Sequence, residues 1–270
     1  MINSQDVFFA GVDIGSVTAK AIILKDKVIT GKSTIPTTVS SEKSGLATLE
    51  KALQSAGVSR SDLKYIIATG YGRIAAPYAN KTVTEITCHA KGANFLNPNT
   101  RTIIDMGGQD CKALRVNEEG HVIDFVLNDK CAAGTGRFLE VVSRIFELTL
   151  DELGPLSLHS NSNELVPISS TCTVFAESEI VSLMARGEKP ENILSGVHYS
   201  IAHRIDGMFA RTGVEAEIFF SGGVAKNTGM RKALEEILEK KIIVSQEDPQ
   251  LVGALGAALL AREKYLARNP

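Results

Sequence analysis

One short pattern occurs twice in this chain of 270 residues, and the repeat constrains both the fold and the ligand. The first copy is Asp13-Ile14-Gly15-Ser16-Val17-Thr18-Ala19-Lys20, and the second is Asp105-Met106-Gly107-Gly108-Gln109-Asp110-Cys111-Lys112. Each copy follows an apolar run that is typical of a buried strand, at Val7–Val12 and Thr102–Ile104. Each is followed by a second strand pattern, a polar turn and a third strand. The repeat therefore predicts strand, glycine turn, strand, turn and strand in both halves of the chain.

The residue types in the repeated turn suit phosphate binding. Glycine lets backbone N–H groups approach an anion, because no Cβ stands in the way. An aspartate at the mouth of the turn can hold Mg²⁺, directly or through water, since hard cations prefer oxygen ligands. Two unrelated Asp-x-Gly turns are the alternative, and a single copy would favour it. The duplication in like context favours two turns that grip a polyphosphate from both sides.

A third glycine turn follows the apolar strand Ile218–Phe220 and precedes the helical pattern Met230–Lys240. It contains the Gly222-Gly223 step, against which a flat ring could lie. The order of the three turns resembles the phosphate-1, phosphate-2 and adenosine motifs of the superfamily that contains actin, sugar kinases and heat-shock chaperone ATPases. That resemblance implies an actin-like α/β fold with two related RNase H-like domains. Neither a Walker nor a Rossmann fingerprint is present.

Composition argues against several other classes of protein. A net charge of −2 provides no basic footprint for nucleic acid, and a hydrophobic content of 44% is enough for a core. The first residues lack the features of a signal peptide, and no apolar run approaches the length of a membrane span. We therefore expect a cytoplasmic protein without a nucleic-acid or membrane partner. The four cysteines are then expected to be thiols or metal ligands rather than disulfides.

The duplicated hairpin favours two domains over one. The polar, proline-containing segment Asn97–Asn99 marks the boundary, which gives domains of residues 1–98 and 99–270. The C-terminal helix could return to the first domain. Further helices are predicted at Gly45–Ala56, Arg137–Leu148, Val174–Arg186, Pro190–Arg211 and Gly253–Leu266.

Two of the four cysteines, Cys131 and Cys172, lie in loops that open predicted helices. Thiols at helix N-termini are favoured as thiolates, the form that binds metal. A cubane cluster needs four thiolates, which two chains related by a twofold axis would supply. Judged by residue type alone, a cysteine is more often a small core residue. We assign Cys88 and Cys111 to that structural class.

Five strings carry a more specific resemblance, which covers the chain nearly end to end. Together they look like the activator component of 2-hydroxyacyl-CoA dehydratases, within the BadF/BadG/BcrA/BcrD-type ATPase family, which has kin among ATPase subunits of benzoyl-CoA reductases. The resemblance implies a homodimeric ATPase in which Cys131 and Cys172 of both subunits share one [4Fe–4S] cluster. It also implies that one low-potential electron passes to a partner iron–sulfur dehydratase or reductase, after recharging by ferredoxin or flavodoxin. The strings are Thr69-Gly70-Tyr71-Gly72-Arg73, Asp105 to Asp110, Asn128 to Phe138, Ser170 to Glu179 and Gly253 to Ala258.

The predicted site residues divide by role. Asp13 and Asp105 are expected near Mg²⁺, directly or through water, and Gln109 is a candidate for orienting the attacking water. Lys20 is expected to neutralise phosphate charge, with a solvent-facing strand lysine as the alternative. The residues expected to bind ATP or ADP are Gly15, Ser16, Val17, Thr18, Lys20, Gly107, Gly108, Gln109, Gly134, Gly136, Gly222, Gly223, Ala225 and Asn227.

Other functions remain open from the sequence. The partner could be a double-cubane or benzoyl-CoA reductase-like protein. A small-molecule kinase of the same superfamily would need a general base, for which Asp105 and Asp110 are the candidates. A nucleotide-gated scaffold without catalysis is the third class. Glu177 and Glu179, near Cys172, could tune the cluster or meet a partner, although a capping or solvated role is favoured.

Overall fold

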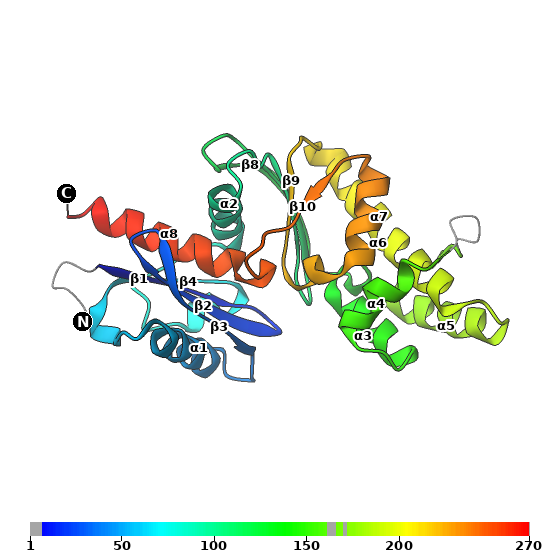
Figure 1. Cartoon of the computed structure of the whole chain (residues 1–270), viewed down its shortest axis with the longest axis horizontal. Helices are drawn as coiled ribbons and strands as arrows, with labels where there is room; N and C mark the ends of the chain where they lie inside the picture. The colour runs from blue at the N-terminus through cyan, green and yellow to red at the C-terminus, as the bar shows by residue number, and fades with distance from the viewer. Residues whose placement is uncertain (1–6, 161–165, 170–171, 270) are drawn as a thin grey trace. The chain divides into compact units, whose positions relative to one another are not determined.

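The chain forms two compact units (Figure 1). The structure is a computed structural model, which describes residues 7–160, 166–169 and 172–269. Unit 1 comprises residues 1–99, 116–122 and 246–270, and unit 2 comprises 100–115 and 123–245. The sequence interpretation assigned 99–270 to the second domain. The structure places the C-terminal segment in unit 1, a possibility that the sequence interpretation left open, and its helix packs on the first sheet. The loop at 116–122 also belongs to unit 1, where the Asn94 side-chain amide donates to the Glu118 carbonyl at 3.1 Å.

Unit 1 is a five-stranded sheet with helices on both faces. Its strand order is β3-β2-β1-β4-β5, and β1 pairs antiparallel with β2 and parallel with β4. Successive side chains of a strand point to opposite faces. Val12 therefore packs against α1, whereas Phe9 contacts α2 and α8. The elements are β1 (Phe8–Ile14), β2 (Thr18–Lys25), β3 (Val28–Pro36), α1 (Ser41–Ala56), η1 (Arg60–Asp62), β4 (Leu63–Thr69), η2 (Tyr71–Ala75), β5 (Lys81–Thr82), α2 (Glu85–Leu96), η6 (Pro249–Leu251) and α8 (Val252–Leu266).

Glycines bring α8 to within backbone contact of its neighbours. A Cβ on Gly11 of β1 would lie 2.0 Å from the carbonyl oxygen of Ala254. A Cβ on Gly256 would lie 1.8 Å from the carbonyl oxygen of Cys88 on α2. The small residues of α8 therefore allow it to pack closely on both the sheet and α2, and Figure 1 shows it beside β1 and β2.

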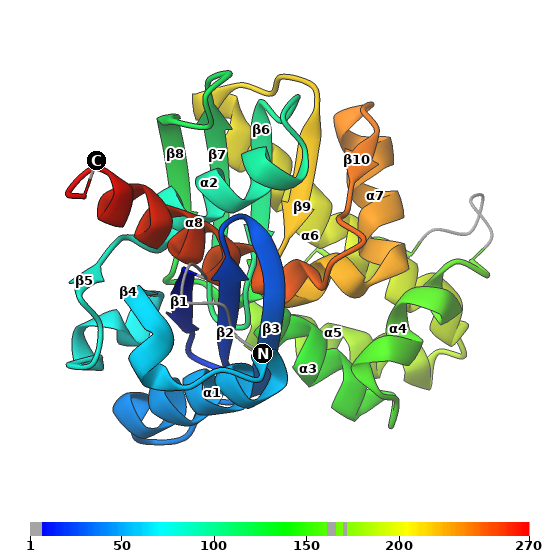
Figure 2. The same cartoon turned by 60° about the vertical axis from the view of Figure 1, so that its left-hand side comes forward.

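Unit 2 contains the second sheet, with the strand order β10-β9-β6-β7-β8 (Figure 2). Strand β6 pairs antiparallel with β7 and parallel with β9. The long helix α6 supplies Ile201 and Ile205 to the core, which also includes Ile104 of β6. The elements are β6 (Thr102–Met106), β7 (Cys111–Val116), β8 (Val122–Asn128), η3 (Ala132–Gly134), α3 (Gly136–Ile145), α4 (Leu150–Ser157), α5 (Thr173–Ala185), α6 (Pro190–Thr212), β9 (Ile218–Ser221), η5 (Gly223–Lys226), α7 (Thr228–Leu238) and β10 (Ile242–Ile243).

The strand–turn–strand units and the predicted helices are confirmed, with shifts of a few residues at their ends. Helices α2 and α4 were not predicted. Helix α4 carries Gly154 and Pro155 within its eight residues, both of which disfavour a helix by local propensity. Helix α2 buries small residues such as Ala90 and Gly92, so it lacks a strong apolar stripe.

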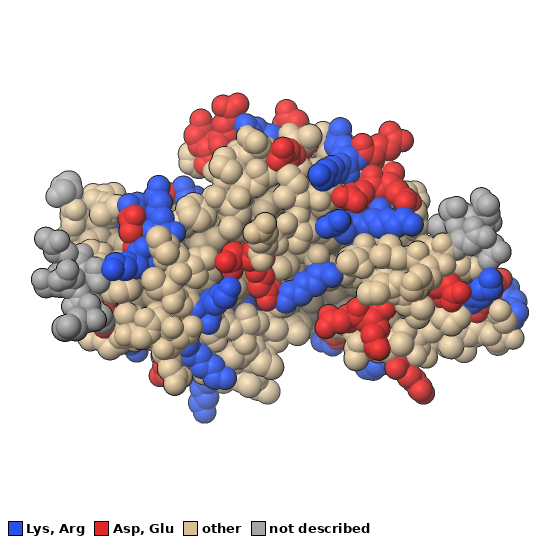
Figure 3. All heavy atoms as spheres, viewed as in Figure 1, with Lys and Arg blue, Asp and Glu red and all other residues tan. Residues whose placement is uncertain are grey.

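The surface carries both signs of charge. On the face shown in Figure 3, basic side chains are interspersed with acidic ones. Of the helices that the structure describes, none combines the length and the apolar character needed to cross a membrane.

A buried histidine joins α4, α6 and the start of α7 in unit 2. His198 of α6 is 1% exposed, and its Nδ1 lies 3.0 Å from the Ser157 hydroxyl. That hydroxyl donates to the Gly154 carbonyl at 2.7 Å, so it accepts from Nδ1–H. The Nε2 atom then accepts from the side-chain amide of Asn227 at 3.1 Å. Burial lowers the pKa of His198 to about 4, which keeps the ring neutral in this arrangement.

The His198 contacts predict a loss of stability in acid. The unfolded ring binds a proton near its ordinary pKa of 6.5, whereas the folded ring does so only near pH 4. The stabilisation is therefore complete above pH 6.5 and is lost as the pH falls toward 4, by about 3 kcal/mol. Urea unfolding of wild type and His198→Gln across this range should show the difference between them shrinking. His203 is exposed on the same helix, and His203→Gln should follow the wild type because His198 is intact.

The close approach of α8 to β1 gives a second prediction. Gly11→Ala should lower the free energy of unfolding by about 1–3 kcal/mol, because the added methyl overlaps the backbone of α8. Gly207→Ala on the exposed side of α6 is the matched control, since nothing lies within 4 Å of its Cβ. That variant should gain about 0.5–1 kcal/mol from helix propensity. Equal urea midpoints for the two variants would contradict the packing argument.

Candidate functional site

The first hairpin (residues 13–20) holds a buried ion pair across its two strands. Asp13 and Lys20 are direct cross-strand partners, and the Lys20 Nζ lies 3.0 Å from the Asp13 Oδ2. Their side chains are only 5% and 12% exposed. The turn is closed by a hydrogen bond from the Gly15 N–H to the Thr18 carbonyl at 3.0 Å. Lys20 is therefore neither a solvent-facing lysine nor a cation without a protein partner.

Two glycines from segments distant in sequence lie close to the Asp13 carboxylate. Gly70 has φ of 84°, and a Cβ there would lie 2.4 Å from the Asp13 Oδ1. A Cβ on Gly253, in α8, would lie 3.2 Å from Oδ2 and 2.7 Å from the His89 Nε2. The sequence interpretation gave none of these three residues a place beside Asp13. A glycine directly after a strand was the available signal for Gly70.

The second hairpin (residues 105–112) repeats the ion pair and adds a carboxylate. Lys112 and Asp105 are again cross-strand partners, with 3.0 Å between Nζ and Oδ2. Lys112 is 2% exposed and also contacts the Asp110 Oδ2 at 2.8 Å. The Ser221 hydroxyl donates to the Asp105 Oδ1 at 3.0 Å. The Asp105 carboxylate is thereby fixed through both of its oxygens.

The third glycine turn lies directly on the second hairpin. Gly222 has φ of 86°, and a Cβ there would lie 2.2 Å from the Met106 carbonyl oxygen. At the end of this turn the Asn227 side chain accepts from the Met230 N–H at 2.9 Å and caps α7. Its amide nitrogen contacts His198, as described above. The structure thus assigns Asn227 a positioning role, and its predicted contact with a nucleotide stays a prediction.

Helix α3 begins on the second hairpin. The Gly136 N–H donates to the Gly107 carbonyl at 2.9 Å, and the Arg137 N–H donates to the Gly108 carbonyl at 2.8 Å. A Cβ on Gly136 would lie 2.9 Å from the Gly107 oxygen. The loop that carries Cys131 leads into this helix, so the hairpin and the cysteine loop are joined by hydrogen bonds.

The predicted nucleotide-binding residues fall into two groups by unit. Those of the first hairpin lie in unit 1, with Ser16 exposed at its tip. The second hairpin, the third turn and the start of α3 come together in unit 2, with Gln109 exposed at the hairpin tip. Ala225 and Gly134 are buried within their turns rather than exposed on the surface of the turns.

The four cysteines divide into an accessible pair and a buried pair. Cys131 is half-buried, and Cys172 is exposed at the N-terminus of α5, which packs against α3. Burial raises the pKa of Cys88 to about 12 and raises the pKa of Cys111 further. A thiol that resists deprotonation is a poor metal ligand. Cys131 and Cys172 are therefore the two more accessible thiols, and their role as cluster ligands stays a prediction.

A single chain offers no complete metal site among the residues that the structure describes. Within those ranges no three His, Cys, Asp or Glu side chains gather so that they could hold an ion. Two accessible thiols in one chain are half the donor set of a cubane cluster. The donor set therefore fits a cluster only if a second chain contributes.

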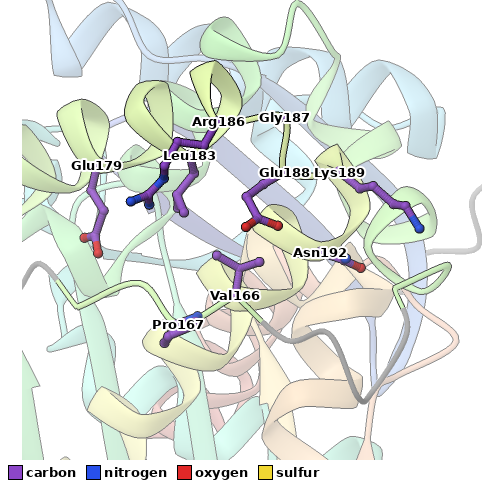
Figure 4. A pocket seen from close by; sticks show the side chains of 9 residues that line it. All are labelled: Val166, Pro167, Glu179, Leu183, Arg186, Gly187, Glu188, Lys189 and Asn192. Carbon is purple, nitrogen blue, oxygen red and sulfur yellow. The ribbon is translucent and has the colours of Figure 1, made fainter.

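A pocket in unit 2 lies at the end of α5 and the turn into α6 (Figure 4). Glu179 lies at this pocket and accepts from the Ser169 N–H at 3.0 Å and from the Ser169 hydroxyl at 2.7 Å. It therefore joins Ser169 to α5. The lining residues are Val166, Pro167, Glu179, Leu183, Arg186, Gly187, Glu188, Lys189 and Asn192, and they include no predicted nucleotide or cluster ligand.

Comparisons with known proteins place this geometry in a family context. The chain is 47% identical over 261 residues to the activator of lactoyl-CoA dehydratase of Anaerotignum propionicum, which covers 95% of this chain and 98% of that protein. The solved structure of the activator of the 2-hydroxyisocaproyl-CoA dehydratase from Clostridium difficile with bound ADPNP matches with a TM-score of 0.91. It is 43% identical, and the match covers 97% of both chains.

More distant structures share the fold. A ROK-family glucokinase from Streptomyces griseus, solved with glucose and AMPPNP, matches with a TM-score of 0.59 at 12% identity, over 95% of this chain and 99% of that one. The predicted actin-like α/β fold is thereby confirmed.

The sequence profile of one family matches residues 10–261, nearly the whole chain. Together with the close relatives of similar length, this match shows that the chain belongs to the BadF/BadG/BcrA/BcrD ATPase family.

Proposed function

We propose that the chain is an ATP-driven electron donor, which activates a partner iron–sulfur 2-hydroxyacyl-CoA dehydratase or a related reductase. The observation that carries this proposal is the hydrogen-bonded junction between the second hairpin and the helix that follows the Cys131 loop. ATP as the nucleotide is supported by the ATPase family and by the ADPNP bound to a relative. Activation of a dehydratase is what the names of the close relatives describe, and we extend it to this chain.

ATP is the substrate of the proposed reaction, and the glycine turns of the two hairpins are the proposed phosphate-binding segments. Backbone N–H groups of the glycine turns would stabilise the phosphate oxygens, and the Gly222-Gly223 step would receive the adenosine. Asp13 and Asp105 each accept a hydrogen bond from a lysine. We propose that they would hold Mg²⁺, directly or through water, where the ion would neutralise charge on the phosphate oxygens. Gln109 would orient the attacking water.

Cys131 and Cys172 of two copies of the chain would hold one [4Fe–4S] cluster on a twofold axis. The accessibility of these two thiols, and the burial of Cys88 and Cys111, support this choice of ligands. When bound, such a cluster stores one low-potential electron, taken from ferredoxin or flavodoxin and passed on to the partner. We place the reaction in the cytoplasm, where thiols stay reduced.

ATP can promote this transfer only by favouring one arrangement of the chain over another. A shift of the Gly107 and Gly108 carbonyls is transmitted to the first turn of α3, because Gly136 and Arg137 bind them directly. The Cys131 loop ends at that turn. The chain can therefore change the surroundings of the Cys131 thiolate when ATP is bound or hydrolysed, without a separate relay.

Iron and sulfide analysis of anaerobically purified protein tests the cluster. We expect about four irons per wild-type dimer, and loss of iron and colour in both Cys131→Ala and Cys172→Ala, because each removes two of the four ligands. Cys111→Ala is the matched control and should keep its iron, since Cys111 is fully buried. A wild-type protein that is monomeric and free of metal under strict exclusion of air would rule the proposal out.

The role of Gln109 predicts a selective loss of ATP hydrolysis. Gln109→Ala should lower kcat on the order of 100-fold while the KM for ATP changes little, because the side chain would act only on the attacking water. Gln54→Ala replaces a similarly exposed glutamine on α1 and should leave both constants unchanged. Steady-state phosphate release by the Mg²⁺-loaded dimer measures this effect. An unchanged kcat in Gln109→Ala would remove Gln109 from the mechanism.

A further inference from the structure

The last residue of β8, Asn128, makes two hydrogen bonds to the peptide groups of Cys131. The Cys131 N–H donates to the Asn128 Oδ1 at 3.1 Å, and the Asn128 Nδ2 donates to the Cys131 carbonyl at 3.0 Å. One carboxamide therefore binds the main chain of Cys131 on both sides of its Cα. These two bonds restrain both backbone dihedrals of the cysteine, which is extended with φ of −122° and ψ of 113°.

Asparagine is suited to this pair of bonds by its chemistry. Its side chain carries an acceptor and a donor on one planar group, close to the backbone. Ionised aspartate has the same shape but only acceptors, so one of its oxygens would face the Cys131 carbonyl. Serine offers a single oxygen, and glutamine places the amide one methylene further away. The arrangement depends on the residue type at position 128.

The rest of the loop closes around this contact. A Cβ on Gly134 would lie 3.0 Å from the Asn128 Nδ2, so glycine at 134 lets the amide approach. Both the N–H and the hydroxyl of Thr135 donate to the Ala132 carbonyl, at 3.0 and 2.8 Å. The next residue, Gly136, binds the second hairpin. Hydrogen bonds therefore restrain the loop on both sides of Cys131, through Asn128 before it and through Thr135 and Gly136 after it.

Cys172 is positioned in a different way. It is exposed at the N-terminus of α5, and its carbonyl accepts the helix's own bond from the Ala176 N–H at 2.9 Å. Among the hydrogen bonds that the structure describes, a side chain binds the main chain of Cys131 and none binds that of Cys172. The main chain of Cys131 is therefore restrained by a side chain before any cluster binds, whereas Cys172 is positioned by the start of α5.

We propose that Asn128 is a positioning residue, which fixes Cys131 in the orientation of a cluster ligand before the cluster is assembled. This inference rests on the proposed function, because it takes Cys131 as a ligand. Outer residues that orient a metal ligand typically change metal retention by about 10- to 100-fold when they are replaced.

Two variants separate the two bonds. Asn128→Asp keeps the acceptor for the Cys131 N–H and loses the donor to its carbonyl, whereas Asn128→Ala loses both. Asp129→Asn is the matched control, because Asp129 is exposed next in sequence and contacts only the exposed Lys130 among the partners that the structure describes. All three should form dimers with the wild-type circular dichroism spectrum.

The first measurement is the rate at which an iron chelator bleaches the anaerobic dimer, together with the midpoint potential of the cluster. Both Asn128 variants should lose iron about 10- to 100-fold faster than wild type and show a shifted potential. Asp129→Asn should match the wild type in both. Equal bleaching rates and equal potentials in all four proteins would overturn the proposal, because a role in folding alone leaves both unchanged in folded protein.

The second measurement uses protein stripped of iron. Hydrogen exchange at the Cys131 amide should be roughly 3- to 10-fold faster in Asn128→Ala than in wild type, which corresponds to the loss of one hydrogen bond. Exchange at the wild-type rate would show that Asn128 does not restrain the loop, and would overturn the proposal on its own. A wild-type protein that never contains iron would instead overturn the proposed function, and this inference with it, even where the exchange rates differ.

Discussion

A lysine and an aspartate face each other across the strands of each hairpin, and each pair is almost fully buried. The same residue spacing produces the same 3.0 Å contact in unit 1 and unit 2. Burying either charge without the other would be strongly destabilising. In each hairpin the aspartate can therefore be buried because a lysine lies opposite it on the next strand. The orientation of both carboxylates, and of the glycines that pack on them, follows from this pairing.

The two hairpins differ in the number of carboxylates around their lysine. In the first hairpin Thr18 stands five residues after Asp13, whereas Asp110 stands five residues after Asp105. Lys112 thus contacts two carboxylates, and Lys20 contacts one. The group around Lys112 retains one negative charge, while the pair around Lys20 is neutral. The duplicated frame carries different electrostatics in its two copies.

Much of the frame was predictable because local patterns agreed with the final fold. Apolar runs, glycine turns and their duplication located the strands of both hairpins, and small-residue loops before helices separated Cys131 and Cys172 from the buried Cys88 and Cys111. These features depend on neighbours in sequence. They can be inferred without knowledge of the tertiary structure.

Contacts between distant segments could not be inferred in the same way. No local pattern indicates that α8 packs on β1, or that Gly70 and Gly253 lie against Asp13. The pairing of Lys20 with Asp13, and of Lys112 with Asp105, depends on strand register. The residue types alone left Lys20 open between phosphate and solvent, and they assigned no role to Lys112. Helix α4 was missed because its tertiary packing outweighs the unfavourable propensities of Gly154 and Pro155.

At the N-terminal end of α3, backbone N–H groups donate to carbonyl groups of the same chain. The N–H groups of Gly136, Arg137 and Phe138 are already bonded, to Gly107, Gly108 and Thr135. These three N–H groups at the positive end of the helix are therefore bonded to the protein rather than available to an incoming anion. Any displacement of residues 107 and 108 would therefore also move the N-terminal end of α3, because hydrogen bonds join the two segments.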